Sequence, residues 1–216
     1  MNIALFGSTG VIGGMLMNMA LENGDTVYAY ARNPEKITVH HENLHVYKGE
    51  LTDAKAMGVV IKNADVVVST IGPALKGKRN DMTTPIADGH EAIIKVMKKF
   101  NKRRLITLAT PSIRTAGDEN SLLLKIIPFG ARLYLPRAYR DMVRLGQVII
   151  NSNIDWTVIR IMNPNAKTSG NGYDVFVGKG KARLSVSREN VARFFYEVTK
   201  RNLYMKKMPV VFNRKT

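Results

Sequence analysis

The chain contains no cysteine among its 216 residues. This absence excludes disulfide bonds, thiolate metal ligands and cysteine nucleophiles. It is typical of proteins in a reducing compartment, so the sequence favours a cytoplasmic location. The spacing of the four histidines suits no metal-ligand set; they are His40, His41, His45 and His90. We therefore expect no metal and interpret these histidines as ordinary surface or edge residues.

Long hydrophobic runs are also missing. Residues 1–21 carry no charged side chain, but glycines and polar residues interrupt them and no basic segment precedes the apolar stretch. That pattern excludes a typical export signal and is too polar for a membrane span. Other uncharged runs, such as VVVSTIGPAL at 66–75, have the length of a core strand. We expect no membrane partner.

Acidic residues are scarce, with 17 Asp and Glu against 33 Lys and Arg, giving a net charge of +16. Such a charge favours anionic partners in general, including nucleotides, nucleic acids and anionic lipid surfaces. The basic residues are scattered, with denser patches at 76–79, 98–104 and 200–207. Scatter is typical of a solvated surface. A nucleic acid or an acidic protein partner is allowed by charge, but no motif supports either.

Short apolar runs alternate with helical patterns along the chain. We predict strands at 2–6, 26–32, 43–49, 64–72, 103–111 and 154–162. We predict helices from 11 to a stop at 23–24, at 52–63 with Thr52 or Asp53 as cap, at about 84–101 and at about 188–200. This alternation predicts an α/β fold with a doubly wound parallel sheet and helices on both faces.

The remaining segments are less regular. Residues 73–82 are predicted to form a basic loop. Residues 112–152 are predicted as a loop followed by helical segments broken at 128–130 and around Pro136. Short strands are predicted near 173–177 and 182–186, and residues 209–212 are apolar. We expect one domain, 1–216, in which 163–216 form a small C-terminal region on the substrate side that closes the sheet edge.

The stretch GSTGVIG at 7–13 places three glycines between the first strand and the first helix. Gly7 permits a tight turn, Gly10 lets backbone approach a pyrophosphate, and Gly13 lets the helix pack closely. Free N–H groups around Val11 and Ile12 would then face the phosphates at the positive end of the helix dipole. The alternative is a tight turn without a ligand; the strand–turn–helix context favours a dinucleotide site.

The end of the second strand decides between the two nicotinamide dinucleotides. An NAD site there usually carries an acidic residue that accepts from the ribose 2′-hydroxyl. This chain has Arg32 at that position, and no acidic residue follows until Glu35. A cation suits a 2′-phosphate, so the sequence predicts NADP(H) in preference to NAD(H). The alternative is a surface arginine at a strand end.

Taken together, these segments resemble the atypical short-chain dehydrogenase/reductase superfamily, in particular its small flavin-reductase-like and biliverdin-reductase-B-like proteins. The resemblance extends from ALFGSTGVIGG and YAYARNPEKI through KGELTD, DVVVSTIG and RLITLAT to NIDWTVIRI and SVSRENVARFFYEV. It implies a Rossmann-type fold that binds NAD(P)H.

The resemblance also implies which residues bind the cofactor. Beyond the turn and Arg32, these residues lie at the carboxyl ends of strands. Residues 50–51 would lie near the adenine, 70–72 near the ribose and phosphates, and 109–110 with 161–163 near the nicotinamide. The full implied set is Gly7, Ser8, Thr9, Gly10, Val11, Ile12, Arg32, Glu50, Leu51, Thr70, Ile71, Gly72, Ala109, Thr110, Ile161, Met162 and Asn163.

One departure from the superfamily concerns catalysis. Its typical members use a Tyr-x-x-x-Lys pair, in which the lysine lowers the pKa of the tyrosine, together with a serine. Here Tyr134 is followed four residues later by Ala138, and Tyr139 by Val143. Ser112 lies near the usual serine, and Ser112 and Tyr139 are weak catalytic candidates. The catalytic group is thus left unknown.

We therefore expect an NADPH-dependent reductase of a flavin, quinone or similar planar acceptor, working by direct hydride transfer. Phe129, Tyr134 and Tyr139 could stack on such a small planar substrate. Two alternatives stay open: a non-catalytic NADP(H)-binding sensor with a protein or nucleic-acid partner, and an epimerase-like enzyme on the same fold. Epimerase chemistry would also need the Tyr-x-x-x-Lys acid–base pair that this chain lacks.

Overall fold

The computed structural model describes residues 1–73, 81–178 and 181–215. Its strands form one sheet in the order β3-β2-β1-β4-β5-β6-β8-β7. β7 is antiparallel to β8, and the other neighbouring pairs are parallel. The strands are β1 (Asn2–Phe6), β2 (Thr26–Ala31), β3 (Leu44–Lys48), β4 (Val66–Ser69), β5 (Arg104–Ala109), β6 (Asp155–Arg160), β7 (Tyr173–Phe176) and β8 (Val210–Asn213).

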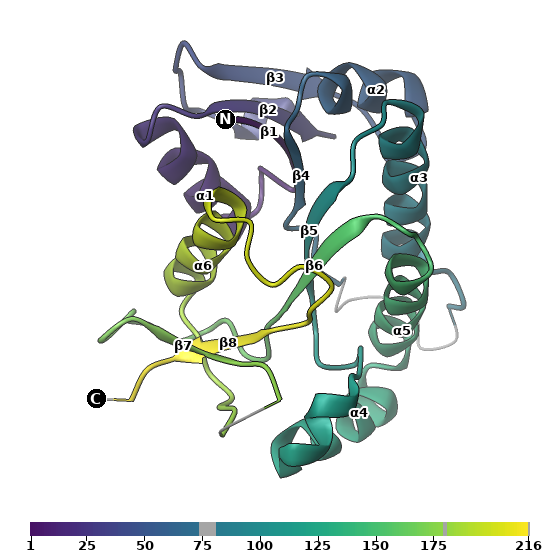
Figure 1. Ribbon diagram of the computed structural model, residues 1–216, viewed down its shortest axis with the longest axis vertical. Helices are drawn as coiled ribbons and strands as arrows, with labels where there is room; N and C mark the ends of the chain where they lie inside the picture. Colours follow the sequence, from purple (N-terminus) through teal and green to yellow (C-terminus); the bar gives the residue numbers. More distant parts are fainter. Residues whose placement is uncertain (74–80, 179–180, 216) are drawn as a thin grey trace.

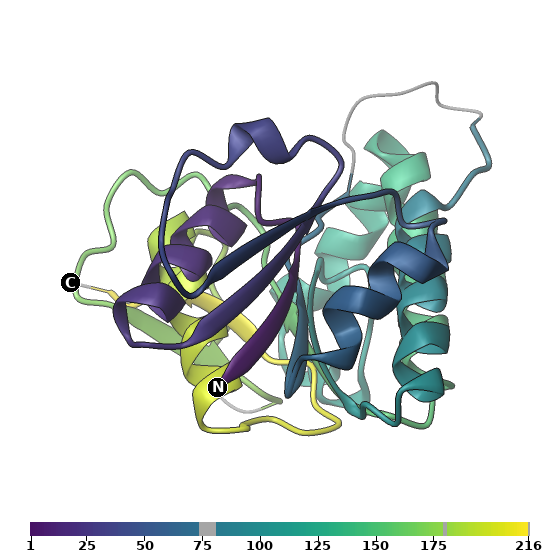
Figure 2. The ribbon, with the colours of Figure 1, turned by 90° about the horizontal axis from the view of Figure 1, so that it is seen from above.

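Helices cover both faces of this sheet (Figure 1). On one face lie α1 (Val11–Glu22) and α6 (Arg188–Lys200). On the other lie α2 (Ala54–Lys62), α3 (Pro85–Lys99) and α5 (Pro136–Ile150), and the view from above shows the sheet between the two layers (Figure 2). α4 (Leu122–Tyr134) lies apart at one end, and two short 3-10 helices, η1 (Pro34–Lys36) and η2 (Ala116–Asn120), complete the fold.

Two hydrophobic cores follow from this arrangement, because successive side chains of a strand point to opposite faces of the sheet. In β1, Ile3 and Leu5 pack in the core shared with α1 and α6, whereas Ala4 and Phe6 pack in the core shared with α2, α3 and α5. Burial on both faces explains why central strands such as β1 and β4 are almost entirely apolar. The predicted α/β fold with a doubly wound parallel sheet is confirmed.

The predicted helix break at 128–130 is wrong. α4 continues through Pro128 to Tyr134, and the chain breaks only at Leu135, before the Pro136 that begins α5. A proline inside a helix removes one main-chain hydrogen bond. Here the Pro128 side chain is buried, and the helix continues past it.

The C-terminal region differs from prediction at 182–186. These residues form no regular strand; Ser185 makes a single parallel bridge with Asn163. They are held instead by hydrogen bonds to both sides, because Asn163 N donates to Leu184 O at 3.0 Å and Asn213 N donates to Ser185 O at 3.0 Å. The neighbouring β8 and β7 extend the sheet beyond β6.

Two further expectations concern loops. The loop predicted after the fifth strand contains η2, which begins with a capping box between Thr115 and Asp118. Most of the basic loop predicted at 73–82, including the basic patch at 76–79, lies outside the described residues. Within the described ranges, no helix combines the length and the apolar character needed to cross a membrane.

Candidate cofactor-binding site

The turn between β1 and α1 is closed by main-chain hydrogen bonds. Gly7 has a φ of 86°, a left-handed conformation that glycine adopts without strain, and Gly10 N donates to Gly7 O at 3.0 Å. Thr70, the residue after β4, donates its hydroxyl to Gly7 O at 3.1 Å and its main-chain N–H to Phe6 O at 2.9 Å. The turn is therefore fixed to the end of the neighbouring strand.

Close packing at this turn requires glycine at two positions. A Cβ on Gly13 would lie 2.2 Å from Gly7 O and 2.6 Å from Thr70 Oγ1. A Cβ on Gly7 would lie 2.8 Å from the same hydroxyl oxygen. At Gly10 the nearest atom would be 3.3 Å away, so the protein itself constrains this position least. Glycine at position 10 has a different explanation, because it lets the backbone approach a ligand closely.

The N-terminus of α1 is open. Gly10 is its N-cap and offers no side chain, none of the described residues supplies a side-chain cap, and the first turn carries no acidic residue. Gly10 and Val11 are exposed. The first N–H groups of α1 thus keep their capacity to donate, and the positive end of the helix dipole favours an anion there. These features fit a dinucleotide pyrophosphate.

The two hydroxyl residues of the turn differ in exposure. Thr9 is exposed, whereas Ser8 is only 2% exposed. The Ser8 hydroxyl has no hydrogen-bond partner among the described residues. Thr9 can therefore donate to a phosphate as the chain stands, while Ser8 needs a small rearrangement of the turn to do so.

The ends of β2 and β3 lie on the adenine side of the turn. Arg32 follows β2, is exposed, and forms no hydrogen bond or ion pair with the residues that the structure describes. The Tyr30 hydroxyl donates to Glu50 O at 2.8 Å and fixes the segment after β3. Burial, with the charges of Asp53 and Glu50, raises the pKa of Tyr30 to about 12. Tyr30 is therefore a structural donor at neutral pH.

Leu51 and Gly49 complete this side. A Cβ on Gly89 of α3 would lie 2.4 Å from Leu51 Cδ1, so Leu51 packs closely on the helix. A Cβ on Gly49 would collide with the Tyr30 ring, at 2.0 Å from its hydroxyl oxygen. Glu50, between them, is exposed and free to reach a ligand.

The ends of β4, β5 and β6 meet at the same edge. Ile71 and Gly72 follow Thr70 and are half-buried, and Thr110 follows Ala109, which is fully buried. Ile161 N donates to Ala109 O at 3.0 Å and so joins the ends of β5 and β6. Two of the expected nicotinamide-side residues, Ala109 and Ile161, are thus brought together in the structure.

The side chains at the end of β6 are directed differently. Ile161 packs in the core under α1 and α6, and Met162 packs against the small cluster of Leu124, Phe176, Val210 and Phe212. Asn163 is exposed and bound to the segment at 184–186. Ile161 can therefore meet a ligand mainly through its backbone.

The two weak catalytic candidates, Ser112 and Tyr139, differ in their exposure to solvent. Ser112 is only 6% exposed, and its main-chain N–H donates to Thr110 Oγ1 at 3.4 Å. Tyr139 lies in the first turn of α5, where it lines an open groove of about 480 Å³ with Arg140 and Val143. No lysine follows either Tyr134 or Tyr139 by four residues.

Two of the three aromatic residues expected to stack on a substrate lie in solvent. Phe129 and Tyr134 of α4 are 73% and 78% exposed. Phe129 is five residues after Leu124 and therefore about 140° away around the helix. The Leu124 side chain packs α4 against β7 and β8. Phe129 thus points away from the body of the protein.

A buried ion pair organises the loop after β5, and sequence reasoning missed it. Arg160 of β6 donates to Asp118 of η2 through Nη1 at 2.6 Å and Nη2 at 2.8 Å. Arg160 also donates to Ile113 O and to Met208 O. An arginine inside the apolar strand DWTVIR was the available sign, because a buried charge needs a partner.

A second missed residue is Asp141 of α5. Its carboxylate accepts from Ile86 N at 3.1 Å and Ala87 N at 2.9 Å, and so caps the N-terminus of α3 from a neighbouring helix. Burial raises the pKa of this carboxyl, an effect that the two N–H donors partly offset. The contact fixes α5, and with it Tyr139, relative to α3. Nothing local in the sequence indicates this pairing.

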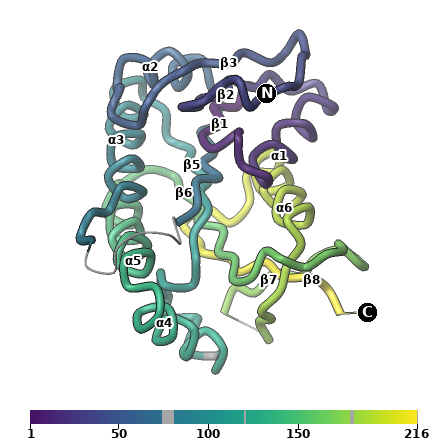
Figure 3. Tube along the Cα trace, turned by 180° about the vertical axis from the view of Figure 1, so that it is seen from behind, coloured from purple at the N-terminus to yellow at the C-terminus, as the bar shows by residue number. Residues whose placement is uncertain are grey.

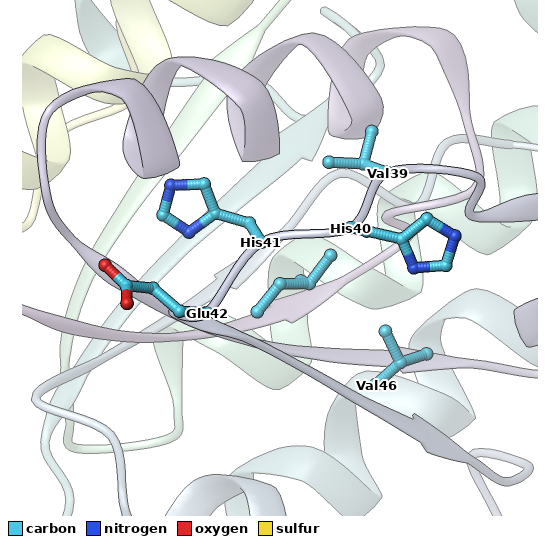
Figure 4. Close-up of a pocket in the computed structure, with 6 residues that line it drawn as sticks. Val39, His40, His41, Glu42 and Val46 are labelled. Atoms are coloured by element: carbon cyan, nitrogen blue, oxygen red, sulfur yellow. The ribbon is translucent and has the colours of Figure 1, made fainter.

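A different hollow lies beside His40 and His41, in the connection between β2 and β3. It measures about 520 Å³ and is lined by Val39, His40, His41, Glu42, Leu44 and Val46. Figure 4 shows the two imidazoles directed away from each other. The hollow is at the amino end of β3, opposite to the edge where parallel sheets bind ligands. No metal-binding group of His, Asp and Glu occurs within the described ranges.

Comparison with known proteins gives a family and a set of structural relatives. A family model described as NAD(P)H-binding matches residues 7–202. No curated protein matches the chain.

The structural relatives share low sequence identity with the chain. A short-chain dehydrogenase/reductase from Veillonella parvula, solved with NADP, has a TM-score of 0.77 at 18% identity, with 100% of this chain and 95% of the relative covered. ChuY, an anaerobillin reductase from Escherichia coli O157:H7, has a TM-score of 0.77 at 17% identity, with 100% and 98% covered. A protein described as an NAD-dependent epimerase/dehydratase from Bacillus halodurans has a TM-score of 0.76 at 20% identity, with 100% and 95% covered.

Proposed function

The chain belongs to the NAD(P)H-binding family, and from this premise we propose that it is an NADPH-dependent reductase of a flavin, quinone or similar planar conjugated acceptor. The observation that carries the proposal is the turn at Gly7–Gly13, whose open α1 N-terminus lies at the carboxyl end of β1. That is the position at which a doubly wound sheet receives a dinucleotide.

Binding would use the residues described above. The N–H groups of α1 and the Thr9 hydroxyl hold the pyrophosphate, and Arg32 pairs with the 2′-phosphate. The exposed, unpaired state of Arg32 supports this preference for NADPH, because a guanidinium forms strong charge-assisted hydrogen bonds with a phosphate. The relative solved with NADP carries its ligand on the same fold.

The reaction we propose needs little from the side chains. NADPH, when bound, supplies a hydride, and a proton from solvent completes the reduction of the acceptor. The ends of β5 and β6, joined through Ala109 and Ile161, hold the nicotinamide side in place, while Tyr139 lies beside the acceptor. The absence of a lysine four residues after Tyr139 supports an acceptor that needs no tyrosine acid–base group.

We also propose that residues 1–216 act as one binding unit, in which residues 163–216 form the substrate side. Support comes from β8, which pairs with β6 at Arg160, and from Asn163, which is bound to the segment at 184–186. An acceptor that stacks on the nicotinamide would lie between this region and the loop that the Arg160–Asp118 pair organises.

The experiment is an acceptor screen. Purified protein is mixed with NADPH and, separately, with FMN, riboflavin, a soluble benzoquinone and biliverdin, and the absorbance of the reduced nicotinamide is followed. Turnover with at least one acceptor, faster with NADPH than with NADH, is the expected result. NADPH binding measured by calorimetry, with no turnover on any acceptor, would contradict the reductase.

That outcome would select a second candidate, a non-catalytic NADP(H)-binding sensor. The observation that favours it is the same missing acid–base pair on α5, together with the net charge of +16 that suits an acidic partner. An epimerase is disfavoured, although one relative is described as an epimerase/dehydratase, because that chemistry moves protons and needs the missing pair.

A further inference from the structure

Helix α4 carries an apolar stripe on its solvent-facing side, which we name the α4 stripe. It consists of Leu122, Ile126, Phe129 and Leu133, which are 73%, 58%, 73% and 49% exposed. Their spacing of four, three and four residues puts them on one face of the helix. Leu124 and Pro128, on the opposite face, are buried. The α4 stripe is thus not the surface by which α4 joins the protein.

The charged residues of α4 beside the stripe are both positive. Lys125 and Arg132 are the only charged residues of α4, and both are exposed. Each immediately precedes a stripe residue, so both lie along the same flank of the stripe. Neither forms an ion pair with a residue that the structure describes.

More positive charge lies at the base of the helix. Ala182 packs against the cluster through which Leu124 fixes α4 to β7 and β8. Lys181 and Arg183, which flank Ala182 in the sequence, are therefore close to α4, and both are exposed. An exposed apolar residue, Leu184, follows them with an exposed fraction of 51%.

α4 also occupies a projecting position. Figures 1 and 3 show it at one end of the molecule, apart from the two helical layers. A convex, projecting helix with an apolar stripe and a basic flank has the properties of helices that lie in the interface of a bilayer. Apolar side chains enter the acyl region, and Lys and Arg remain among anionic headgroups.

We propose that α4 docks the protein on the surface of an anionic lipid bilayer, with the α4 stripe inserted at the interface. Charge favours this occupant over a second copy of the chain, because each copy carries +16 and a two-fold contact through the stripe would bring the basic flanks together. The sequence predicted no membrane partner because it contains no span, but docking on a surface requires none.

The test is flotation with vesicles of phosphatidylcholine alone and of phosphatidylcholine with phosphatidylglycerol. We expect the wild type to bind only the anionic vesicles, and to bind less as salt is raised. Ile126→Ser with Phe129→Ser should weaken binding by at least about tenfold, because both side chains lose their insertion area. Lys125→Gln with Arg132→Gln should weaken it by about tenfold through lost attraction to the headgroups.

A matched control lies on α2, which carries an exposed Val59 at 47% and two exposed lysines, Lys55 and Lys62. Val59→Ser, and Lys55→Gln with Lys62→Gln, change the same chemistry elsewhere and should leave vesicle binding within about twofold of wild type. Circular dichroism confirms that each variant is folded.

The absence of native cysteine permits a direct readout of insertion. Phe129→Cys and Val59→Cys, each labelled with an environment-sensitive dye, should differ, with a blue shift on anionic vesicles only at position 129. Equal dye responses, or unchanged binding by the Ile126/Phe129 double variant, would overturn the proposal. The proposal would also be overturned if the wild type did not bind anionic vesicles at low salt. The same holds if Phe129 mediated dimer formation or binding of an acidic protein and not binding to vesicles.

Discussion

Arg160 and Asp118 are joined by two parallel hydrogen bonds, of 2.6 and 2.8 Å, between side chains that are each only 1% exposed. The pair connects the end of β6 to η2, and the same guanidinium donates to Ile113 O. The segment that follows β5 is thereby fixed at the edge where we place the cofactor. Asp118 also closes the capping box with Thr115, so one carboxylate serves two structural purposes.

Replacing Asp118 by Asn should therefore destabilise the protein strongly. The change leaves the Arg160 charge buried without a counter-charge, and breaking such a pair costs about 3–5 kcal/mol. The measurement is urea unfolding followed by circular dichroism. The exposed neighbour Glu119 provides the control, because Glu119→Gln should change the free energy of unfolding by less than about 0.5 kcal/mol. Equal effects of the two changes would contradict this account of the pair.

Arg32→Ala should separate the two cofactors. If Arg32 pairs with the 2′-phosphate, its loss should weaken NADPH binding by roughly tenfold to a hundredfold, since a hydrogen bond to a charged group is worth about 1.5–3 kcal/mol. NADH binding, measured by the same calorimetry, should change by less than about twofold. Lys62→Ala on α2 controls for the lost positive charge. Equal weakening for NADPH and NADH would remove the basis for the preference.

Gly13→Ala should impair the dinucleotide turn, because the new Cβ would lie 2.2 Å from Gly7 O, a main-chain atom. The turn must shift, so we expect NADPH affinity to fall by at least about tenfold. Gly14→Ala is the matched control, since its Cβ would lie at an ordinary 3.6 Å from Ser8 O. In the helix this control should add about 0.5–1 kcal/mol of stability. Unchanged affinity in Gly13→Ala would show that the turn does not hold the cofactor.

His90 should make the protein sensitive to acid. The predicted surface or edge position is wrong for His90, whose ring is fully buried between Ile86 O and the Thr107 hydroxyl. Burial lowers its pKa from 6.5 to about 4. Above pH 6.5 the ring is neutral in both states and the protein keeps its full stability. As the pH falls from 6.5 towards 4, only the unfolded chain takes up the proton, so stability falls by about 1.4 kcal/mol per pH unit.

The comparison that isolates this effect is His90→Gln. Urea midpoints between pH 7 and pH 4 should fall less steeply in this variant than in wild type. His45 is exposed, so His45→Gln should retain the wild-type slope. A His90→Gln slope equal to that of wild type would mean that His90 is protonated in the folded protein.

Tyr139→Phe and Ser112→Ala test the proposed chemistry. Since direct hydride transfer to a conjugated acceptor needs no tyrosine acid, each variant should keep kcat within about threefold of wild type with its best acceptor. A tyrosine or serine that took part in proton transfer would cost about a hundredfold or more. A loss of that size, with NADPH affinity unchanged, would assign the residue to catalysis and reject transfer without an acid–base group.

The layered fold follows from local patterns in the sequence. Apolar runs such as VVVS in β4 form strands that are buried on both faces. Helices such as α6 occupy the predicted ranges because the spacing of apolar residues indicates which face of a helix is buried. The sequence also predicts the turn at 7–13, since Gly7 takes a positive φ and Gly13 packs against Gly7 O within one strand–turn–helix unit. Pro128 misled because the sequence does not show that its side chain packs on the protein.

Contacts between residues that are distant in the chain are visible only in the three-dimensional structure. Asp141 caps a helix that begins 56 residues earlier by number, and Asp118 meets an arginine 42 residues away. Neither contact produces a periodic pattern in the sequence from which it could be predicted. The same holds for α4, whose Phe129 and Tyr134 the sequence places beside a planar substrate. Packing through Leu124 uses one face of that helix and leaves Phe129 in solvent, because a helix can bury only the side that its neighbours cover.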